Sequence, residues 1–392
     1  MTDKIKYYPV GNGDQSLIIL KDQTTIQIDC NIRQASHDEN QKDFFDVKKD
    51  FLSILKKRDN NTFIDVFVLS HGDCDHTRGF KKNYYQGDPS EYNKENREAN
   101  EIIIDEMWFS PMIAEEHTNT DEDAYQQEAE RRLALHLKKD ANKDLPGNRI
   151  RIIGYDGDKK YKDLDHLRSI PGTVINTFNN KTQTTFSIFI HSPFKEQLLA
   201  AEKDKNSTSI VFQARFKNNE KDKNFNCLAM FAGDADYIAW GIILQKTISS
   251  GKDETEKALY WDLFLAPHHC SWTFFNDTPQ EENKEPKDDS LEILRYRRNG
   301  GRIISSSKKI IDNDDNPPHF AAKEEYLKTL EKESDFFNTA IEPNEDSPEP
   351  ILFKISSNGI EKEKTESEIK KDRLKAATAV AAGAIIKQPW GY

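Results

Sequence analysis

The spacing of hydrophobic residues along this chain changes between two periods, and each period predicts a different element. Ile64 to Leu69 is apolar at every position except Asp65, which is typical of a buried strand. Apolar residues three and four positions apart over 43–58 and 121–139 predict helices with one buried face. The same criteria predict strands at 150–153, 173–178, 186–191, 209–216, 227–231, 263–266, 302–306 and 351–355, and helices at 235–248, 287–298 and 320–333.

The predicted strands fall into two groups, and helices follow each group. Residues 5–30 supply two short strands joined at Gly11-Asn-Gly13, and the strands from 173 to 231 form the second group. This order predicts an α/β (α+β) fold in which two sheets pack face to face and helices cover the outside. The loops that follow the strands of both groups should then meet along one edge.

Two parts of the chain fall outside this pattern. We expect residues 1–342 to form one domain, with a helical and irregular insertion over roughly 81–170. Such an insertion serves as a lid, a specificity wall, a partner surface or a solvated excursion. Residues 343–392 form a C-terminal extension with a charged helix at 361–375 and an alanine-rich, aromatic tail. The tail docks into a protein partner, packs back on the body or stays disordered.

The composition is that of a polar-surfaced, acidic protein. The 392 residues are 36% hydrophobic and 32% charged, with a formal net charge of −12. No run reaches the ~20 apolar residues that span a bilayer, so we expect no membrane contact and a cytoplasmic protein. The net charge opposes general adhesion to nucleic acid but leaves room for a local basic groove. Candidate patches, or else ordinary solvated faces, are Lys56–Arg58, Lys81–Lys82 and Arg295–Arg298.

The four cysteines form no Cys-x-x-Cys pair, which excludes a zinc ribbon. So few cysteines in so long a chain suit a reducing compartment. Cys74 and Cys270 stand beside the candidate metal ligands described next. There a cysteine either fills space as a buried thiol or serves as a thiolate ligand.

The segment after the strand at 64–69 carries the strongest chemical signal in the sequence. His71, Asp73, Asp75 and His76 place two imidazoles and two carboxylates within six positions. These groups cannot form an apolar core, and the carboxylates repel one another unless a divalent cation lies between them. Ligands at positions i, i+2, i+4 and i+5 suit two adjacent metal ions. We therefore expect the loop to form half of a dinuclear hydrolase site.

The His-x-Asp-x-Asp-His string resembles the His-x-His-x-Asp-His signature of the metallo-β-lactamase superfamily, with Asp73 in place of the second His. This variant resembles the metallohydrolase domain of ComEC-type DNA-uptake proteins and their soluble relatives. The resemblance covers roughly residues 5–325 and implies a four-layer αββα sandwich. Further segments resemble family elements in the order that the family requires, and these are Val10–Ser16, Thr25–Cys30, Asp105–Ser110, Asn206–Val211, Met230–Asp234, Asp262–Ser271 and Pro318–His319.

The resemblance also implies a set of metal ligands. His71 and Asp73 would hold the first ion, and Asp75 and His76 would hold the second. Asp234 would bridge the two ions.

The remaining ligands are less sharply defined. His268 or His269 would complete the shell of the second ion, and the other member of this doublet would contact the substrate or protonate the leaving group. A further ligand of the first ion is expected at His191 or at Asn206, unless His191 is only a buried residue at a strand end. Candidate catalytic and substrate-contacting residues are Asp75, His269, Ser271 and His319.

Asp73 changes the expected metal and substrate. A carboxylate is a hard donor and shifts preference from zinc toward manganese or magnesium. The oxygen-rich site disfavours a β-lactam and favours a phosphodiester, whose developing charge the ions balance. We therefore expect two divalent ions, zinc or manganese with magnesium as a further option, that activate a hydroxide.

The expected activity is that of a metal-dependent hydrolase, a phosphodiesterase or nuclease acting on DNA or another nucleic acid. Two alternatives are left open by the sequence. One is hydrolysis of a small molecule or peptide-like bond within a multi-gene bacterial system. The other is a non-catalytic interaction module.

Overall fold

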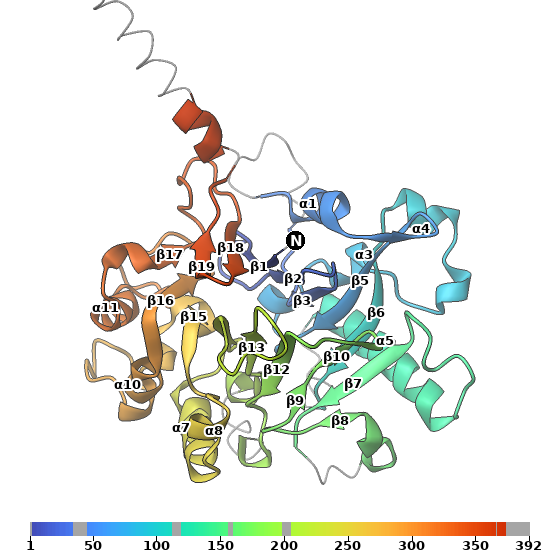
Figure 1. Ribbon diagram of the computed structural model, residues 1–392, viewed down its shortest axis with the longest axis horizontal. Helices are drawn as coiled ribbons and strands as arrows, with labels where there is room; N and C mark the ends of the chain where they lie inside the picture. Colours follow the sequence, from blue (N-terminus) through green and yellow to red (C-terminus); the bar gives the residue numbers. More distant parts are fainter. Residues whose placement is uncertain are drawn as a thin grey trace, which may run out of the picture.

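The computed structural model describes residues 2–33, 45–111, 119–155, 160–197, 205–365 and 367–373. Two large sheets dominate this mixed α/β protein, and helices lie on their outer sides (Figure 1). The predicted fold class is confirmed at this level. Among the described residues, no helix is both long and apolar enough to cross a membrane.

The first sheet has ten strands, drawn mostly from the N-terminal half. They are β1 (Asp3–Tyr7), β2 (Ser16–Ile19), β3 (Thr25–Ile28), β4 (Lys57–Arg58), β5 (Asn61–Val68), β6 (Ile103–Phe109), β7 (Arg149–Ile153), β8 (Arg168–Ser169), β18 (Ile351–Ser356) and β19 (Gly359–Lys362). Their order is β19-β18-β1-β2-β3-β5-β6-β7-β8, and β4 pairs with β5 outside this path. The strands from β3 through β8 on this path run parallel to one another, whereas β1 and β2 pair antiparallel.

The second sheet has seven strands, all of which follow β1 to β8 in the chain and lie between residues 174 and 338. They are β9 (Val174–Ile175), β12 (Phe186–Ile190), β13 (Phe212–Phe216), β14 (Cys227–Phe231), β15 (Trp261–Leu265), β16 (Arg297–Ser305) and β17 (Phe336–Asn338). Their order is β17-β16-β15-β14-β13-β12-β9. β14, β15 and β16 are parallel neighbours, so their carboxyl ends lie on the same side. A small separate hairpin joins β10 (Thr177–Phe178) and β11 (Lys181–Thr182).

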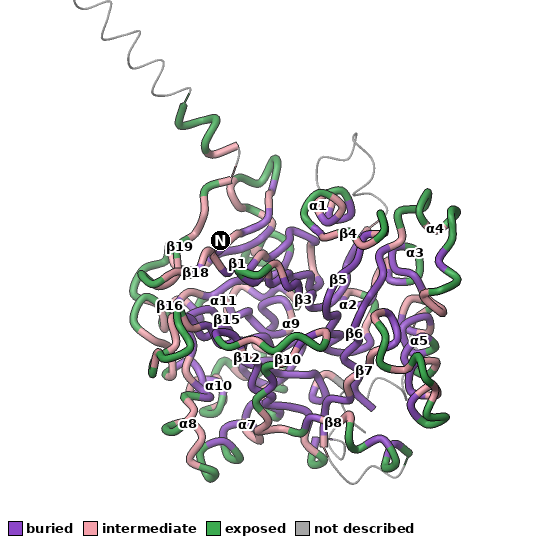
Figure 2. Tube along the Cα trace, turned by 45° about the vertical axis from the view of Figure 1, so that its right-hand side comes forward, coloured by how far each residue is buried: buried purple, intermediate pink, exposed green. Residues whose placement is uncertain are grey.

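A cluster of buried side chains fills the space between the two sheets. It combines Val66 and Trp108 of the first sheet with Phe212 and Leu263 of the second. The next side chain along β5, Phe67, belongs to a different cluster on the opposite face. Successive side chains of a strand point to opposite faces, so the unbroken apolar run of β5 reflects burial on both. Figure 2 shows this buried interior between exposed helices and loops.

Two further clusters attach helices to the outer faces. Phe51 of α1 (Val47–Ile54) and Tyr125 of α5 (Thr120–Leu137) pack on the first sheet. Trp240 of α7 (Tyr237–Ser249), Ile293 of α10 (Asp288–Arg295) and Tyr326 of α11 (Phe320–Thr329) pack on the second. The order of layers is therefore helix, sheet, sheet, helix. Shorter elements are α2 (Cys74–Thr77), α3 (Phe80–Asn83), α4 (Lys94–Glu98), α8 (Lys252–Thr255), α9 (Pro267–Cys270), η2 (Pro89–Glu91), η4 (Lys162–Leu167), η5 (Lys205–Thr208), η6 (Trp272–Phe274) and η7 (Glu333–Asp335).

Most predicted elements are present, and two predictions are wrong. Residues 5–30 contain parts of three strands, because Leu17 to Ile28 turns once more between β2 and β3. The predicted helix at 361–375 begins too early, since Gly359–Lys362 is the strand β19 and pairs with β18. The alanine-rich, aromatic tail lies outside the described residues.

The interval 81–170 is not a solvated excursion. It supplies β6, β7 and β8, which extend the first sheet beyond β5. It also supplies α5, which packs on that sheet through Tyr125, Ala129 and Leu133. This interval is therefore an integral part of the layered body.

A buried ion pair fixes α5 on the sheet. The Nε of Arg132 lies 2.7 Å from Oε1 of Glu128, and its Nη2 donates to the carbonyl oxygen of Ile104 in β6 at 2.9 Å. Both side chains are about 1% exposed. Removing one partner would leave the other charge buried and unpaired, which costs several kcal/mol.

We predict that Glu128→Ala lowers the free energy of unfolding by about 3–5 kcal/mol. Glu130→Ala, on the exposed side of the same helix, should change it by less than about 0.5 kcal/mol. Urea unfolding of the two variants measures both values. Equal effects would show that the buried pair does not hold the helix in place.

Candidate metal centre

Loops that follow strands of both sheets meet at one end of the molecule. β5 leads into Ser70 and His71, β14 leads into Gly233 and Asp234, and β15 leads into the doublet at 268 and 269. Backbone hydrogen bonds hold the loops in place, and the N–H of Ile210, just before β13, donates to the carbonyl of Ser70 at 2.8 Å. The N–H of His268 likewise donates to the carbonyl of Gly233 at 3.1 Å. The predicted meeting of the loops is confirmed.

Asp29, at the end of β3, orients His76. Its carboxylate accepts hydrogen bonds from the Ser70 N–H at 2.6 Å and the Ser70 hydroxyl at 2.7 Å. The same carboxylate lies 2.9 Å from Nδ1 of His76. An imidazole that donates from Nδ1 to a carboxylate presents the lone pair of Nε2 on its other side, which is the usual arrangement of a metal-binding histidine.

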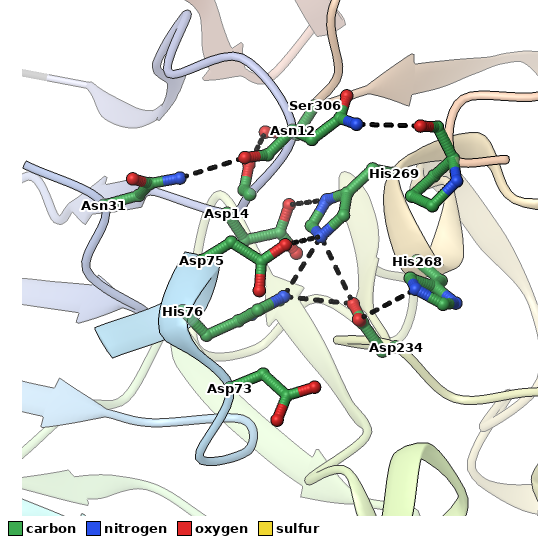
Figure 3. A network of polar contacts seen from close by, with 12 residues as sticks. Asn12, Asp14, Asn31, Asp73, Asp75, His76, Asp234, His268, His269 and Ser306 are labelled. Atoms are coloured by element: carbon green, nitrogen blue, oxygen red, sulfur yellow. Dashed lines mark hydrogen bonds and ion pairs between the residues drawn. The ribbon is translucent and has the colours of Figure 1, made fainter. Parts of the chain in front are cut away.

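One group of donor atoms surrounds Nε2 of His76 (Figure 3). This nitrogen of His76 lies 3.0 Å from Oδ1 of Asp234 and 3.2 Å from Nε2 of His269. His269 Nε2 is also 3.2 Å from Oδ2 of Asp75, and its Nδ1 is 3.5 Å from Oδ1 of Asp14. Donors from four separate segments therefore face one another.

A second group surrounds the other oxygen of Asp234. Oδ2 of Asp234 lies 3.4 Å from Nε2 of His71 and 3.5 Å from Nε2 of His268. Asp73 contributes an oxygen 3.9 Å from Nε2 of His71. The two oxygens of Asp234 thus face different histidines. His269 lies with Asp75 and His76, whereas His268 lies on the side of His71, so neither member of the doublet stands apart from the carboxylate.

Four of these atoms are buried and have no hydrogen-bond partner among the described residues, namely His71 Nε2, Asp14 Oδ1, Asp234 Oδ1 and His269 Nδ1. Burying an unsatisfied polar atom is costly, and a cation bound among such atoms would remove that cost. Two sets of donors, His71 with His76 and Asp234, and Asp14 with His76 and His269, each lie within 4.8 Å of one another. Buried groups of this kind can hold a metal ion.

The electrostatics of the cluster favour positive charge at its centre. Burial opposes ionisation of Asp234, but the surrounding imidazoles outweigh it and hold the pKa of this carboxyl well below its usual value. Burial likewise opposes a charged His269, but Asp234, Asp14 and Asp75 together raise its pKa to about 10. The pKa of His76 is raised well above its ordinary value because Asp234 and Asp29 outweigh burial. Bound protons or metal ions are therefore stabilised here.

The backbone of the doublet is unusual. His268 (φ 48°) and His269 (φ 54°) are left-handed, and Cys270 (φ 69°) continues the same conformation. Each non-glycine residue in this region costs roughly 1–3 kcal/mol, so the surrounding packing must enforce it. The result is that two consecutive imidazoles both reach Asp234.

The two cysteines beside the centre do not extend it. Cys270 is buried, and burial raises the pKa of its thiol to about 12, which disfavours a thiolate ligand. Cys74 is exposed, and its Sγ lies 3.5 Å from Nη2 of Arg78.

His191, expected as a ligand of the first ion, is not in either donor group. Its Nε2 lies 2.9 Å from the carbonyl oxygen of Ala258, and its ring packs 4.8 Å from that of Phe189. Burial lowers the pKa of His191 to about 3, helped by the charge of Arg215. The structure therefore favours the alternative of a buried, neutral histidine at a strand end.

Of the other expected site residues, Ser271 directly follows Cys270, and the N–H of His319 donates to the carbonyl of Cys270 at 2.9 Å. The hydroxyl of Ser271 donates to Oδ1 of Asn316 at 2.7 Å. His319 caps α11, accepting from the N–H of Ala321 at 3.2 Å, and its ring lies 5.8 Å from that of Trp272. Asn206 lies in η5, where its carbonyl accepts from the N–H of Ser209. None of these contacts assigns a substrate role.

Two acidic residues of the centre were not predicted as site residues. Asp14 follows Gly13 and brings a buried carboxylate to His269. Asp29 ends β3 and supports His76. The sequence signal was present in both cases, since each aspartate stands at the end of a short apolar strand or its turn, as His71 does.

Part of one predicted basic patch is neutralised by acidic partners. Arg58 pairs with Asp105, its Nη2 lying 2.7 Å from Oδ1, and Lys56 pairs with Asp65 at 2.8 Å. These cations support the sheet at the end of β5 opposite to His71.

Comparison with known proteins adds no identification. No protein-family model matches the chain, and no curated protein matches it. The metallo-β-lactamase resemblance therefore rests on the motifs and stays a prediction.

Substitution of Gly233 would show whether the metal centre depends on the close contact between this residue and Ser70. A Cβ at this position would lie 2.8 Å from the Oγ of Ser70 and 2.9 Å from its Cβ. We predict that Gly233→Ala lowers the free energy of unfolding by about 1–3 kcal/mol beyond its backbone cost, and weakens manganese binding roughly 10–100-fold. Urea unfolding and manganese titration provide the measurements.

Gly251→Ala is the matched control. Gly251 has a similar left-handed backbone (φ +67°), but no atom of the part of the chain that the structure describes lies within 4 Å of its added Cβ. It should share only the backbone cost of about 1 kcal/mol. Identical behaviour of the two variants would contradict the close contact between Gly233 and Ser70.

His191 gives a prediction about pH. Its folded pKa is about 3, whereas an unfolded histidine titrates near ~6.5. Between these values the unfolded chain binds more protons, so this contribution to stability falls as the pH falls below ~6.5. From pH ~7 to ~4.5 the wild type should lose about 2–3 kcal/mol more than His191→Gln. Denaturant unfolding at both pH values measures the difference.

His166→Gln, at an exposed histidine, should keep the wild-type pH dependence. If His191→Gln also keeps it, His191 is not held neutral by burial.

Proposed function

We propose that this chain is a metal-dependent phosphodiesterase with a metallo-β-lactamase-type αββα sandwich, and that it acts on nucleic acid. The observation that carries the proposal is the position of Asp234, whose two oxygens face two sets of histidines. The order of layers and the meeting of strand ends from both sheets support the choice of sandwich.

The donors fit two divalent ions. Asp75, His76 and His269 would hold one ion with Oδ1 of Asp234. His71 and His268 would hold the other with Oδ2 of Asp234, and Asp73 stands close enough to join them. His268 thereby takes the place for which His191 or Asn206 was expected. Asp73 and Asp75 add hard oxygen donors to the imidazoles, which shifts the metal preference from zinc toward manganese or magnesium.

When bound, a pair of divalent ions supplies a hydroxide nucleophile at neutral pH and polarises the scissile phosphoryl group. The protein's own side chains keep the donors in position. Asp29 holds His76 through Nδ1. The Oγ1 of Thr273 lies 2.9 Å from Nδ1 of His268, which leaves Nε2 of His268 directed at Asp234.

Exposure separates the donors that face the substrate from those behind them. His76 and His269 have fully buried side chains, so His269 is a ligand and not a substrate contact in this proposal. Asp73 and Asp75 are 27% and 31% exposed, and His268 is 19% exposed. Exposed carboxylates alone would repel a phosphodiester, so binding of this substrate requires the cations.

Asp234→Asn provides the direct test of function. An amide cannot bridge two cations as a carboxylate does, so metal content should fall and hydrolysis should drop at least ~100-fold. His191→Gln should keep both metal and activity. Metal analysis after reloading with manganese, magnesium or zinc gives the first measurement, and hydrolysis of a single-stranded oligonucleotide and of bis(p-nitrophenyl) phosphate gives the second.

The outcomes separate the proposals. Hydrolysis that survives Asp234→Asn would contradict the proposed site. Cleavage of the small diester alone would favour a small-molecule substrate. A wild-type protein that binds no metal would favour a non-catalytic module.

A further inference from the structure

Three basic residues from separate segments surround the loop that precedes Asp14, Arg33 and Arg78 through their guanidinium groups and Lys308 through its backbone. Nη2 of Arg33 donates to the carbonyl of Asn12 at 3.2 Å, and the backbone N–H of Lys308 donates to Oδ1 of the same residue at 3.0 Å. Asn31 also donates to this carbonyl, at 3.1 Å, and its Oδ1 accepts from Nη1 of Arg78 at 3.4 Å. Figure 3 shows Asn12 and Asn31 beside the metal centre.

The same loop reaches the metal centre through its next two residues. The carbonyl of Gly13 accepts from the hydroxyl of Ser306 at 2.7 Å. The N–H of Asp14 donates to the carbonyl of Asp75 at 3.3 Å, and its carboxylate faces His269. Because consecutive Cα atoms are ~3.8 Å apart, Asn12 lies within about 8 Å of Asp14 along the backbone. Arg33, which contacts Asn12, is also close enough to Asp75 for the charge of that carboxylate to act on it.

A cavity of about 470 Å³ opens on this side of the loop. Arg33, Lys308 and Lys309 line it together with Gly11, Glu345 and Asp346. Lys309 pairs with Glu345, whereas Lys308 is exposed at the margin. A cavity of this size accommodates one nucleotide-sized group and is too small for a double helix.

Charge makes the cavity suitable for an anion. The protein carries a net charge of −12, so a cluster of basic residues is a local exception to its overall negative charge. Burial lowers the pKa of Arg33, and the neighbouring charge of Arg78 lowers it further while Asp75 opposes this. Arg33 thus lies in the fields of both a guanidinium and the centre. A phosphate bound between the cations would relieve their mutual repulsion.

We propose that Arg33, Arg78 and Lys308 bind the phosphate that neighbours the scissile one in a single-stranded nucleic acid. This inference rests on the proposed phosphodiesterase function. It adds the path of the substrate, in which the nucleic acid leaves the metal centre over Asn12 and enters the cavity. Positive grooves that follow the backbone are the usual means of binding single strands without sequence preference.

Two substrates separate binding of the neighbouring phosphate from chemistry at the metal centre. A short single-stranded oligonucleotide has the neighbouring phosphate, and bis(p-nitrophenyl) phosphate lacks it. Lys308→Glu and Arg33→Gln should each raise KM for the oligonucleotide roughly tenfold, and each should reduce the slope of log kcat/KM against log salt by about one. Their kcat/KM for the small diester should stay within about twofold of wild type.

Lys57→Glu is the matched control, because Lys57 is exposed on β4 at the opposite end of β5. It should leave both substrates and the salt slope unchanged. Parallel loss of both substrates in Lys308→Glu and Arg33→Gln would place these cations in support of the metal centre and overturn the inference. Unchanged kinetics of Lys308→Glu and Arg33→Gln with the oligonucleotide would also overturn the inference.

The wild type separates the two proposals. Cleavage of the small diester without cleavage of the oligonucleotide would overturn the inference and leave the phosphodiesterase in place. Failure to cleave either substrate with any of the three metals would remove the proposed function, and this inference with it.

Discussion

A buried carboxylate surrounded by imidazoles constrains the rest of this molecule. Asp234 is only 2% exposed, yet its pKa stays well below the ordinary value because burial is outweighed by the neighbouring histidines. An uncompensated charge in such a position would cost several kcal/mol. The fold must therefore keep cations, either protons or metal ions, within reach of both carboxylate oxygens. Four imidazoles meet this requirement, two from the loop after β5 and two from the loop after β15.

The constraint reaches well beyond the donors. Gly233 lies so close to Ser70 that a side chain would collide with it. The doublet adopts a left-handed backbone that delivers adjacent rings to one carboxylate. The N-terminal end of α5 also supports the loop at 71–76, since Nδ2 of Asn119 donates to the carbonyl of Gly72 at 3.2 Å. Strain at the doublet and close packing behind it are the kind of local cost that folded proteins concentrate at functional sites.

The helices, strands and most metal donors could be predicted from the sequence. Which donors face which oxygen of Asp234 could not. Strand β5 and the loop after it were predictable because the histidines and aspartates that end the apolar run cannot continue an apolar core. His191 ends a strand in a similar way, but register turns its ring toward Ala258, and register cannot be read from a single strand. The division of His268 from His269 depends on left-handed backbone angles, which are uncommon for any residue other than glycine and cannot be predicted from the sequence. Within the interval 81–170 the strand at 150–153 and the helix at 121–139 were predicted, but the sequence pattern did not show that β6, β7 and β8 extend the first sheet.

The most direct test of the bridging role of Asp234 is anomalous diffraction from crystals of the full chain grown with manganese. We expect two anomalous peaks about 3.5–4 Å apart, one on each side of the Asp234 carboxylate. His76 and His269 should lie against one peak, and His71 and His268 against the other. Peaks elsewhere, or none at Asp234, would contradict a two-metal centre built on this carboxylate.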